Sequence, residues 1–251
     1  MDHYENFPVA SWLCPPGLRA PILALYGFAR TADDIADEGE ANAEQRLRTL
    51  AEYREDLHRV YRNPLARSAR WPQVFEALAQ QHQTWSFPLG LLEDLLDAFE
   101  QDVIYTRDQR NYQDRAELLD YCRRSANPIG RLLLHLVQVN DAESLAYSDA
   151  ICSALQLINF WQDLSVDLPR GRRYLPNGAS LPDELAYARH LMEQGAPLVH
   201  RLSGRFGWEL RLVVQGGLRI LDKSQRLDTR HTRPVLRAWD APVMLWRALW
   251  M

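Results

Sequence analysis

The spacing of apolar residues is the feature that most constrains how this chain folds. Apolar side chains recur every three or four positions, which is the period of a helix, and the alternation typical of strands is nearly absent. The pattern predicts helices over residues 18–38, 42–62, 72–83, 88–103, 114–138, 144–167, 182–204, 207–228 and 234–249. Because the 251 residues contain no internal repeat and no linker-like tract, we expect a single all-α domain over residues 1–251.

Proline and capping residues predict where helices begin and end within the stretch 114–138. Pro128 lies inside 114–138 and removes a backbone hydrogen bond, so we expect a break or kink at Asn127-Pro128. Asp114 and Glu117 have the spacing of a capping box at the start of the same stretch.

Composition limits the partners and the compartment. The net charge of -4 and the sequence pI near 6.0 do not indicate a nucleic-acid partner. Cys14, Cys122 and Cys152 are spaced neither as zinc ligands nor as a disulfide framework, which favours a reducing compartment. The acidic N-terminal residues lack the basic region of a signal peptide, so we expect a cytoplasmic protein.

Two pairs of aspartates carry the strongest functional signal. Asp33 and Asp37 are four residues apart, as are Asp163 and Asp167, so on a helix each pair projects from one face. A glycine follows the first pair and a Leu-Pro-Arg-Gly segment follows the second, which predicts that both pairs end helices. That is the negative end of the helix dipole, where a bound cation would reverse an unfavourable balance. We interpret the pairs as two halves of a divalent-metal site.

Further polar side chains share these two helical faces: Tyr26, Arg30, Gln156 and Asn159. Carboxylate and amide oxygens suit Mg²⁺, which also binds diphosphate oxygens, and arginines such as Arg172 would bind the remaining diphosphate oxygens. The alternative is a solvated acidic face whose charges are balanced by nearby arginines.

Two longer motifs surround the aspartates. The first is Leu25-Tyr26-Gly27-Phe28-Ala29-Arg30, and the second runs from Gln156-Leu157-Ile158-Asn159 to Gly171-Arg172-Arg173-Tyr174-Leu175-Pro176. With them the chain resembles the squalene/phytoene synthase family, from about Tyr4 to Trp239. The resemblance implies a class I isoprenoid synthase-like helical bundle with a central cavity, acting on trans-isoprenoid diphosphates.

The same resemblance implies roles for individual residues. The implied metal ligands, for about two or three Mg²⁺ ions, are Asp33, Asp37, Asn159, Asp163 and Asp167. The implied substrate-binding residues are Ser11, Tyr26, Arg30, Arg123, Gln156 and Arg172. Tyr121 would lie beside the reacting carbon, and Tyr121 or Asn127 would position a water molecule.

Two departures from the family pattern bear on the substrate. Members that condense two prenyl diphosphates usually carry a basic residue before the Ser11-Trp12 pair and an arginine before the first aspartate of the second motif. This chain has Ala10 and Gln162 there, which indicates a pocket for one diphosphate. The local sequence resembles the bacterial hydroxysqualene synthases of hopanoid pathways, which convert presqualene diphosphate to hydroxysqualene.

That subgroup implies a carbon–oxygen lyase: metal-assisted ionisation of the diphosphate, rearrangement of a cyclopropylcarbinyl cation in an apolar cavity, and capture by water. No NADPH is expected, and the chain has no GxGxxG fingerprint. The expected partners are the lipid diphosphate and the pathway enzymes that make presqualene diphosphate and reduce hydroxysqualene. Two alternatives stay open: a transferase that condenses two farnesyl diphosphates to presqualene diphosphate or squalene, and a catalytically silent assembly protein.

The C-terminal segment from Trp239 to Met251 is apolar and rich in tryptophan. It predicts either a helix packed on the core or a peripheral contact with the inner membrane.

Overall fold

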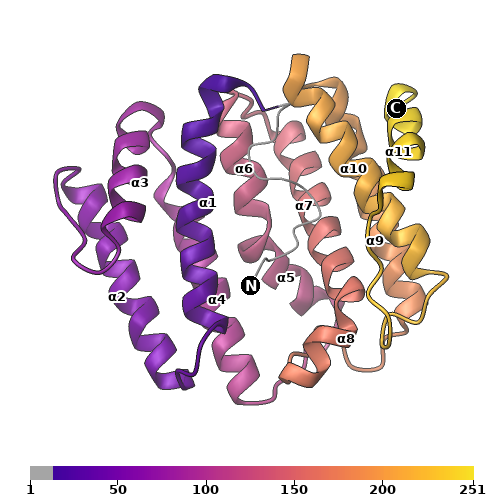
Figure 1. The fold of residues 1–251 in the computed structure, drawn as a ribbon, viewed down its shortest axis with the longest axis horizontal. Helices are drawn as coiled ribbons and strands as arrows, with labels where there is room; N and C mark the ends of the chain where they lie inside the picture. The colour runs from indigo at the N-terminus through magenta and orange to yellow at the C-terminus, as the bar shows by residue number, and fades with distance from the viewer. Residues whose placement is uncertain (1–13) are drawn as a thin grey trace.

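The computed structural model describes residues 14–251, and every regular element in that range is helical (Figure 1). The α-helices are α1 (Pro16–Asp37), α2 (Ala43–Arg62), α3 (Pro72–Trp85), α4 (Leu89–Arg107), α5 (Arg115–Ser125), α6 (Asn127–Leu136), α7 (Ala142–Gln162), α8 (Leu164–Asp167), α9 (Leu181–Gly195), α10 (Gly204–Ser224) and α11 (Ala241–Leu249). Short 3₁₀ turns span Leu168–Arg170, Ala196–His200 and Ala238–Asp240. The predicted all-α class is confirmed.

The predicted break before Pro128 is confirmed, because α5 ends at Ser125 and the proline lies in the first turn of α6. Only half of the expected capping box forms. The Asp114 carboxylate accepts from the Glu117 amide at 2.9 Å, whereas the Glu117 carboxylate accepts from the amide of Gln113. A further break was not predicted: α7 ends at Gln162, one residue before the first aspartate of the second pair.

The core has two clusters of buried side chains. One contains Phe28 and Tyr53 and gathers apolar residues of α1 to α4, and the other surrounds the fully buried Trp161 of α7. Helix α7 packs against α5, α6, α9 and α10, which explains why its sequence is apolar nearly all round. Helices α4 and α6 contribute to both clusters and join them.

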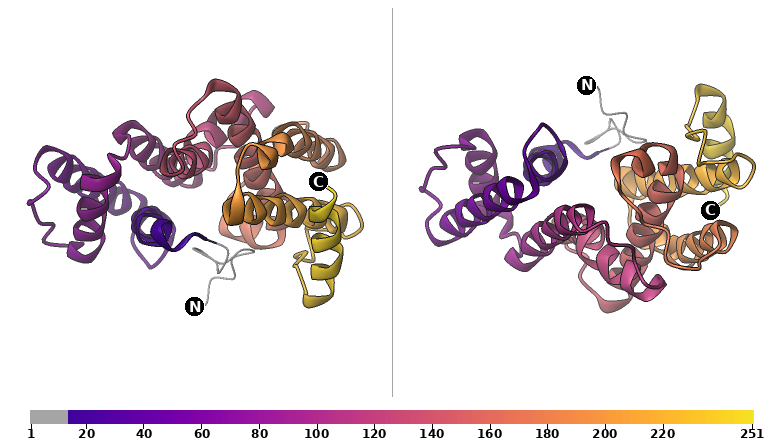
Figure 2. Two further views of the ribbon diagram at one scale, coloured as in Figure 1. Left: turned by 90° about the horizontal axis from the view of Figure 1, so that it is seen from above. Right: turned by 90° about the horizontal axis from the view of Figure 1, so that it is seen from below.

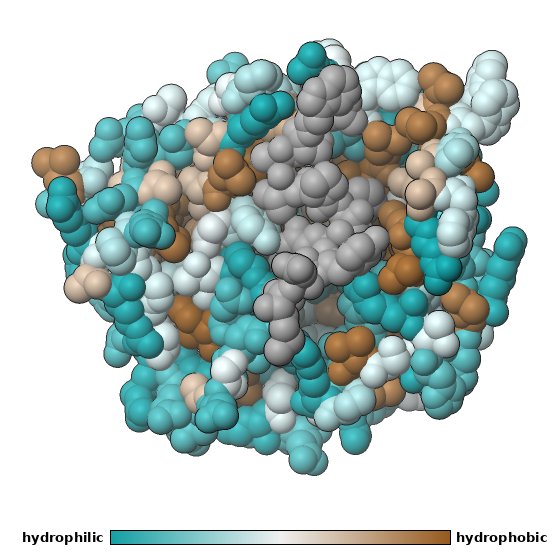
Figure 3. Space-filling model, in the orientation of Figure 1, coloured by the Kyte–Doolittle hydropathy of each residue, from teal (hydrophilic) through white to brown (hydrophobic). Residues whose placement is uncertain are grey.

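The direction of the helices decides where the two aspartate pairs lie. Helices α1 and α7 run the same way, and their C-terminal ends lie at the lower edge of the molecule in Figure 1. The views from above and below show the indigo helix α1 set apart from the orange helices of the C-terminal half (Figure 2). In the space-filling view, hydrophilic residues form most of that lower edge (Figure 3). Two negative helix ends therefore converge on one region.

Helix α11 lies at the outer side of α10 and leaves much of its apolar surface exposed. Trp239, Trp246 and Trp250 are 64%, 63% and 76% exposed. Within residues 14–251, no helix combines the length and the apolar character needed to cross a bilayer.

Candidate active site

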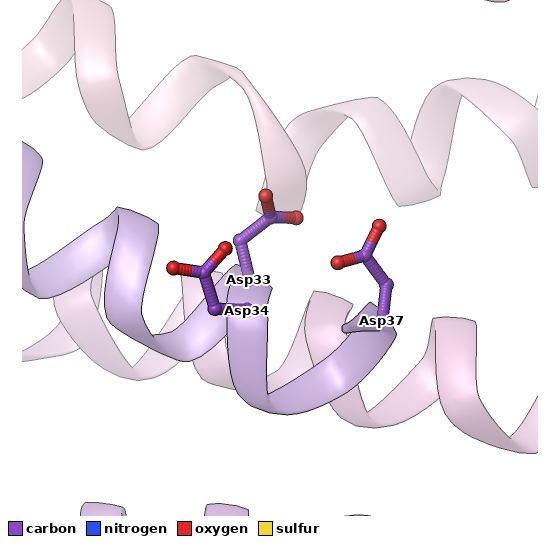
Figure 4. A group of neighbouring side chains, drawn as sticks. All are labelled: Asp33, Asp34 and Asp37. Atoms are coloured by element: carbon purple, nitrogen blue, oxygen red, sulfur yellow. The ribbon is translucent and has the colours of Figure 1, made fainter. Parts of the chain in front are cut away.

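The first aspartate pair lies in the last two turns of α1. The helix ends at Asp37, and no basic residue in its last turn offsets the helix dipole. The carboxylates of Asp33 and Asp37 project from the same side of the helix, with Asp34 beside Asp33 (Figure 4). Carboxylate oxygens of the three residues lie within 4.8 Å of one another. Arg30 balances part of this charge through contacts of 2.8 Å to Asp33 and 2.5 Å to Asp34.

The second pair lies where α7 gives way to α8. Asp163 is the residue after the end of α7, and its amide donates to the carbonyl of Asn159 at 2.9 Å. Asp167 ends the single turn of α8. The last turn of α7 also lacks a basic residue, so the second helix end is as electronegative as the first.

Both pairs face one cavity of 830 Å³, which we call the polar cavity. Its polar and aromatic lining comprises Asp33, Asp37, Asp102, Tyr121, Ser125, Gln156, Asn159, Phe160, Asp163, Asp167, Arg172 and Tyr174. The five predicted metal ligands are thus brought together from helices that are far apart in the sequence.

The polar cavity carries an excess of negative charge. Burial, followed by the neighbouring Asp37, raises the pKa of Asp33 to about 6, and burial raises the pKa of Asp167 to about 6. One carboxylate oxygen of Asp37 is buried without a hydrogen-bond partner, while the other accepts from Arg172 at 2.8 Å. Several convergent carboxylates with one amide oxygen form a donor set that fits a hard divalent cation such as Mg²⁺.

An apolar cavity of 620 Å³ adjoins the polar one. Asp33, Phe99 and Gln156 line both, so the two spaces meet at these side chains. The remaining wall is mostly aliphatic and aromatic, from α1, α6, α7 and α10, and it includes the predicted substrate-binding residues Tyr26 and Arg30. The arrangement suits a ligand with a charged head and a long hydrocarbon body.

Two of the predicted site residues line neither cavity. Arg123 is 55% exposed, pairs with Asp120 at 3.1 Å and lines neither cavity. Asn127 is buried and accepts a hydrogen bond of 2.9 Å from Ser153. Its side chain therefore lies in the contact between α6 and α7 and does not line the polar cavity. Ser125, two residues earlier, lines the polar cavity instead. Ser11, which was also expected to bind substrate, lies outside the described residues.

Gln162 does not face the cavity. It is fully buried, and its amide donates to the carbonyl of Pro234 at 2.5 Å. The missing positive charge at this position therefore says nothing about how many diphosphates the cavity accepts. A cation that the sequence did not reveal lies next to it: Arg233 forms a bidentate ion pair with Asp163.

Asp102 was also missed. It belongs to α4 and shares a stripe with Phe99, Val103 and Thr106, all of which line the polar cavity. Burial raises its pKa to about 7, and it accepts a 2.5 Å hydrogen bond from Tyr121. The 3-4-7 spacing of this stripe was present in the sequence, but without the fold nothing indicated that it faced the aspartates.

The family model that describes squalene/phytoene synthase matches residues 1–179. The chain is 39% identical over 175 residues to hydroxysqualene synthase of Zymomonas mobilis, and 39% identical over 176 residues to hydroxysqualene synthase of Rhodopseudomonas palustris. These matches cover 69% and 68% of this chain, but only 55% of each relative, so the matched part spans about half their length. Presqualene diphosphate synthase of R. palustris is 28% identical over 97% of this chain and 89% of its own length.

Solved structures agree with the fold. Squalene synthase HpnC from Alicyclobacillus acidocaldarius superposes with a TM-score of 0.77 at 32% identity, covering 92% of this chain and 91% of that one. A dehydrosqualene synthase superposes with a TM-score of 0.65 at 18% identity over 92% of this chain and 85% of that one, which supports the fold alone. With a family model that matches most of its length, this chain belongs to the squalene/phytoene synthase family.

Proposed function

We propose that residues 1–251 act as one domain that ionises a prenyl diphosphate. The diphosphate would lie in the polar cavity, between the aspartate pairs of α1 and α7–α8, and the hydrocarbon would lie in the apolar cavity. The observation that carries this proposal is the contact between a carboxylate-rich cavity and an apolar one at Asp33, Phe99 and Gln156.

The specific reaction that we propose is the conversion of presqualene diphosphate to hydroxysqualene. Relatives named hydroxysqualene synthase share 35–39% identity with this chain, whereas those named presqualene diphosphate synthase share 28–30%. Ala10 in place of a basic residue still favours one diphosphate. The argument from Gln162 no longer contributes, since that side chain points away from the cavity.

The proposed metal ligands are Asp33, Asp37, Asn159, Asp163 and Asp167. Mg²⁺ held by these oxygens would supply the positive charge that offsets the developing charge of the leaving diphosphate. Arg172 already lies against Asp37 and could turn its remaining donors to a diphosphate oxygen. Arg233 and Arg30 hold the Asp163 and Asp33 carboxylates in fixed orientations.

The carbocation that ionisation leaves would be confined by aromatic and aliphatic walls. Phe160 and Tyr174 stack with ring centroids 3.8 Å apart and both line the polar cavity. Aromatic faces in such a wall stabilise a cation by about 0.5–2 kcal/mol. Water would then capture the cation beside Tyr121, with no reductant required.

Product analysis tests this proposal. Purified protein is incubated with presqualene diphosphate, with and without Mg²⁺, and separately with farnesyl diphosphate. Mg²⁺-dependent diphosphate release with hydroxysqualene as the product is expected from the first substrate only. Presqualene diphosphate or squalene from farnesyl diphosphate would show the condensing transferase, and no release from either substrate would show a non-catalytic member.

A variant pair controls the metal assignment. Asp163→Ala should abolish diphosphate release while the helical circular dichroism spectrum stays unchanged. Asp97→Ala removes an aspartate of α4 that pairs with Arg54 of α2 and lines neither cavity, and it should leave release unchanged. An active Asp163→Ala protein with normal Mg²⁺ dependence would refute the ligand assignment.

We also propose a peripheral contact of α11 with an anionic membrane. Residues 201–251 contain ten basic and four acidic residues, against a net charge of -4 for the whole chain. Exposed tryptophans beside arginines are typical of helices that lie in a lipid interface. Sedimentation with anionic and with zwitterionic vesicles tests this: Trp246→Ser/Trp250→Ser should lose binding to the anionic vesicles, and equal binding of this variant would exclude the contact.

A further inference from the structure

Asp102 and Tyr121 form a hydrogen-bonded pair in the wall of the polar cavity. The Tyr121 hydroxyl donates to one carboxylate oxygen of Asp102 at 2.5 Å, and both residues line the cavity. The two side chains come from α4 and α5, which pack against each other. The tyrosine ring is held by its neighbours, with Tyr112 at 5.8 Å and Phe160 at 6.1 Å between ring centroids. The ring and its hydroxyl therefore have little freedom to turn.

This pair determines which way the tyrosine hydroxyl points its proton. A phenol has one proton to donate and accepts through its oxygen lone pairs. Burial and the Asp102 carboxylate raise the pKa of Tyr121, so the phenol keeps its proton, and the 2.5 Å contact makes it the donor to the ionised carboxylate. Once that proton is directed at Asp102, only the acceptor side of the oxygen remains available to a ligand.

Stability alone does not favour a carboxylate at this position. Asp102 shares the cavity with four other aspartates, and the charges of Asp33 and Asp37 raise its pKa further after burial has done so. An apolar side chain there would avoid both the burial of a charge and the repulsion. The hydrogen bond from Tyr121 is the contact that distinguishes an aspartate from such a residue.

From this geometry we propose that Asp102 is a positioning residue for Tyr121, which presents the tyrosine oxygen as a hydrogen-bond acceptor toward the reacting centre. Resting on the function proposed above, the acceptor would hold one O–H of the water molecule, whose oxygen lone pair forms the new C–O bond to the carbocation. The proton that this water loses would pass to the departed diphosphate. Tyr121 would then be unable to donate a proton to the leaving diphosphate. Asp102 does not contact the substrate in this scheme and acts only through Tyr121.

The test is the partition of products, because a merely structural role would not change it. With presqualene diphosphate and Mg²⁺, the ratio of hydroxylated to non-hydroxylated hydrocarbon products is measured by gas chromatography and mass spectrometry for Tyr121→Phe, Asp102→Leu and the double variant. Each single change should lower the ratio by roughly tenfold, the order expected for one lost hydrogen bond. The double variant should be no worse than Tyr121→Phe. Asp97→Leu, on the same helix but lining neither cavity, is the matched control and should keep the wild-type ratio.

Two results would overturn the proposal: a wild-type product ratio in Asp102→Leu, or a double variant whose loss is the product of the two single losses.

A second measurement needs neither substrate nor a variant of Asp102. The ultraviolet resonance Raman doublet of tyrosine, taken as wild type minus Tyr121→Phe, should report a strong hydrogen-bond donor, and an acceptor-type signal would refute the pair. If the wild-type protein released no diphosphate, the proposed function would fail while the Raman result still decided the geometry.

Discussion

Replacing Asp33 with asparagine should stabilise the metal-free protein and remove most of the stabilisation that Mg²⁺ gives. The pKa of Asp33 is raised from 3.8 to about 6 in the fold. At about 1.36 kcal/mol for each pKa unit, the ionised form costs about 3 kcal/mol at neutral pH. Because the side chain is 37% exposed, solvent screening reduces this to about 1.5 kcal/mol. The raised pKa already includes the attraction of Arg30, so the net gain is about 1.5 kcal/mol.

The assay is thermal unfolding of the wild type and Asp33→Asn, in chelator and in Mg²⁺. In chelator at pH 7 the variant should melt about 3–6 °C higher. A raised aspartate pKa costs stability above the folded pKa and not below the unfolded one, so the difference should shrink as pH falls from about 6 to 3.8. At an Mg²⁺ concentration of 100 times Kd the wild type should gain about 2.7 kcal/mol, and the variant much less.

The matched control is Asp97→Asn, an aspartate on the same molecule that is 50% exposed and pairs with Arg54. Loss of this exposed ion pair, worth about 0.5 kcal/mol, should lower the melting temperature by about 1–2 °C, and equally in chelator and in Mg²⁺. The reasoning is refuted if Asp33→Asn melts lower than the wild type in chelator at pH 7, or if it gains as much from Mg²⁺ as the wild type does.

Three further predictions concern the scaffold. Asp240 is fully buried and pairs with Arg219 and Lys223, so Asp240→Ala should lower the free energy of unfolding by about 3–5 kcal/mol in chemical denaturation. Those pairs lower the pKa of Asp240 to about 2. The contribution of Asp240 to the free energy of unfolding should therefore persist above pH 3.8 and disappear as the pH falls toward 2. Acid titration of the wild type and the variant measures this difference. Gly195→Ala would bring a methyl group within 2.5 Å of a backbone oxygen at the α7–α9 contact. It should lower the free energy of unfolding by about 1–3 kcal/mol in chemical denaturation. Gly90→Ala, whose methyl group meets nothing within 4 Å, should not destabilise the protein.

Helical periodicity was sufficient to predict the secondary structure because each apolar stripe is a local property of the chain. Every predicted helical stretch contains a helix within residues 14–251, and the break before Pro128 follows from the missing amide hydrogen of proline. The unpredicted break after Gln162 has no such residue. The Gln162 side chain at the break is buried and bonds to the carbonyl of Pro234, a tertiary contact that no local pattern reveals.

The aspartate pairs were found from the sequence for the same reason. The four-residue spacing and the helix-ending residues are local, so the prediction that Asp33, Asp37, Asp163 and Asp167 face one space needed only the assumption that the two helix ends meet. Residues without such a spacing were harder to assign. Arg123 and Asn127 were selected by their closeness to a motif. In the fold, Arg123 pairs with Asp120 on the surface of α5, and Asn127 bonds to Ser153 between α6 and α7.

The sequence by itself determined that this chain is helical, that two helices end in paired carboxylates, and which family it belongs to. Only the tertiary structure decided which other groups share that space. Asp102 and Arg233 come from segments with no recognisable motif, and they reach the aspartates because α4 and the segment after α10 pack beside them. Helix formation depends on neighbours three or four residues away, whereas a cavity wall is assembled from residues whose separation in sequence carries no signal of their proximity.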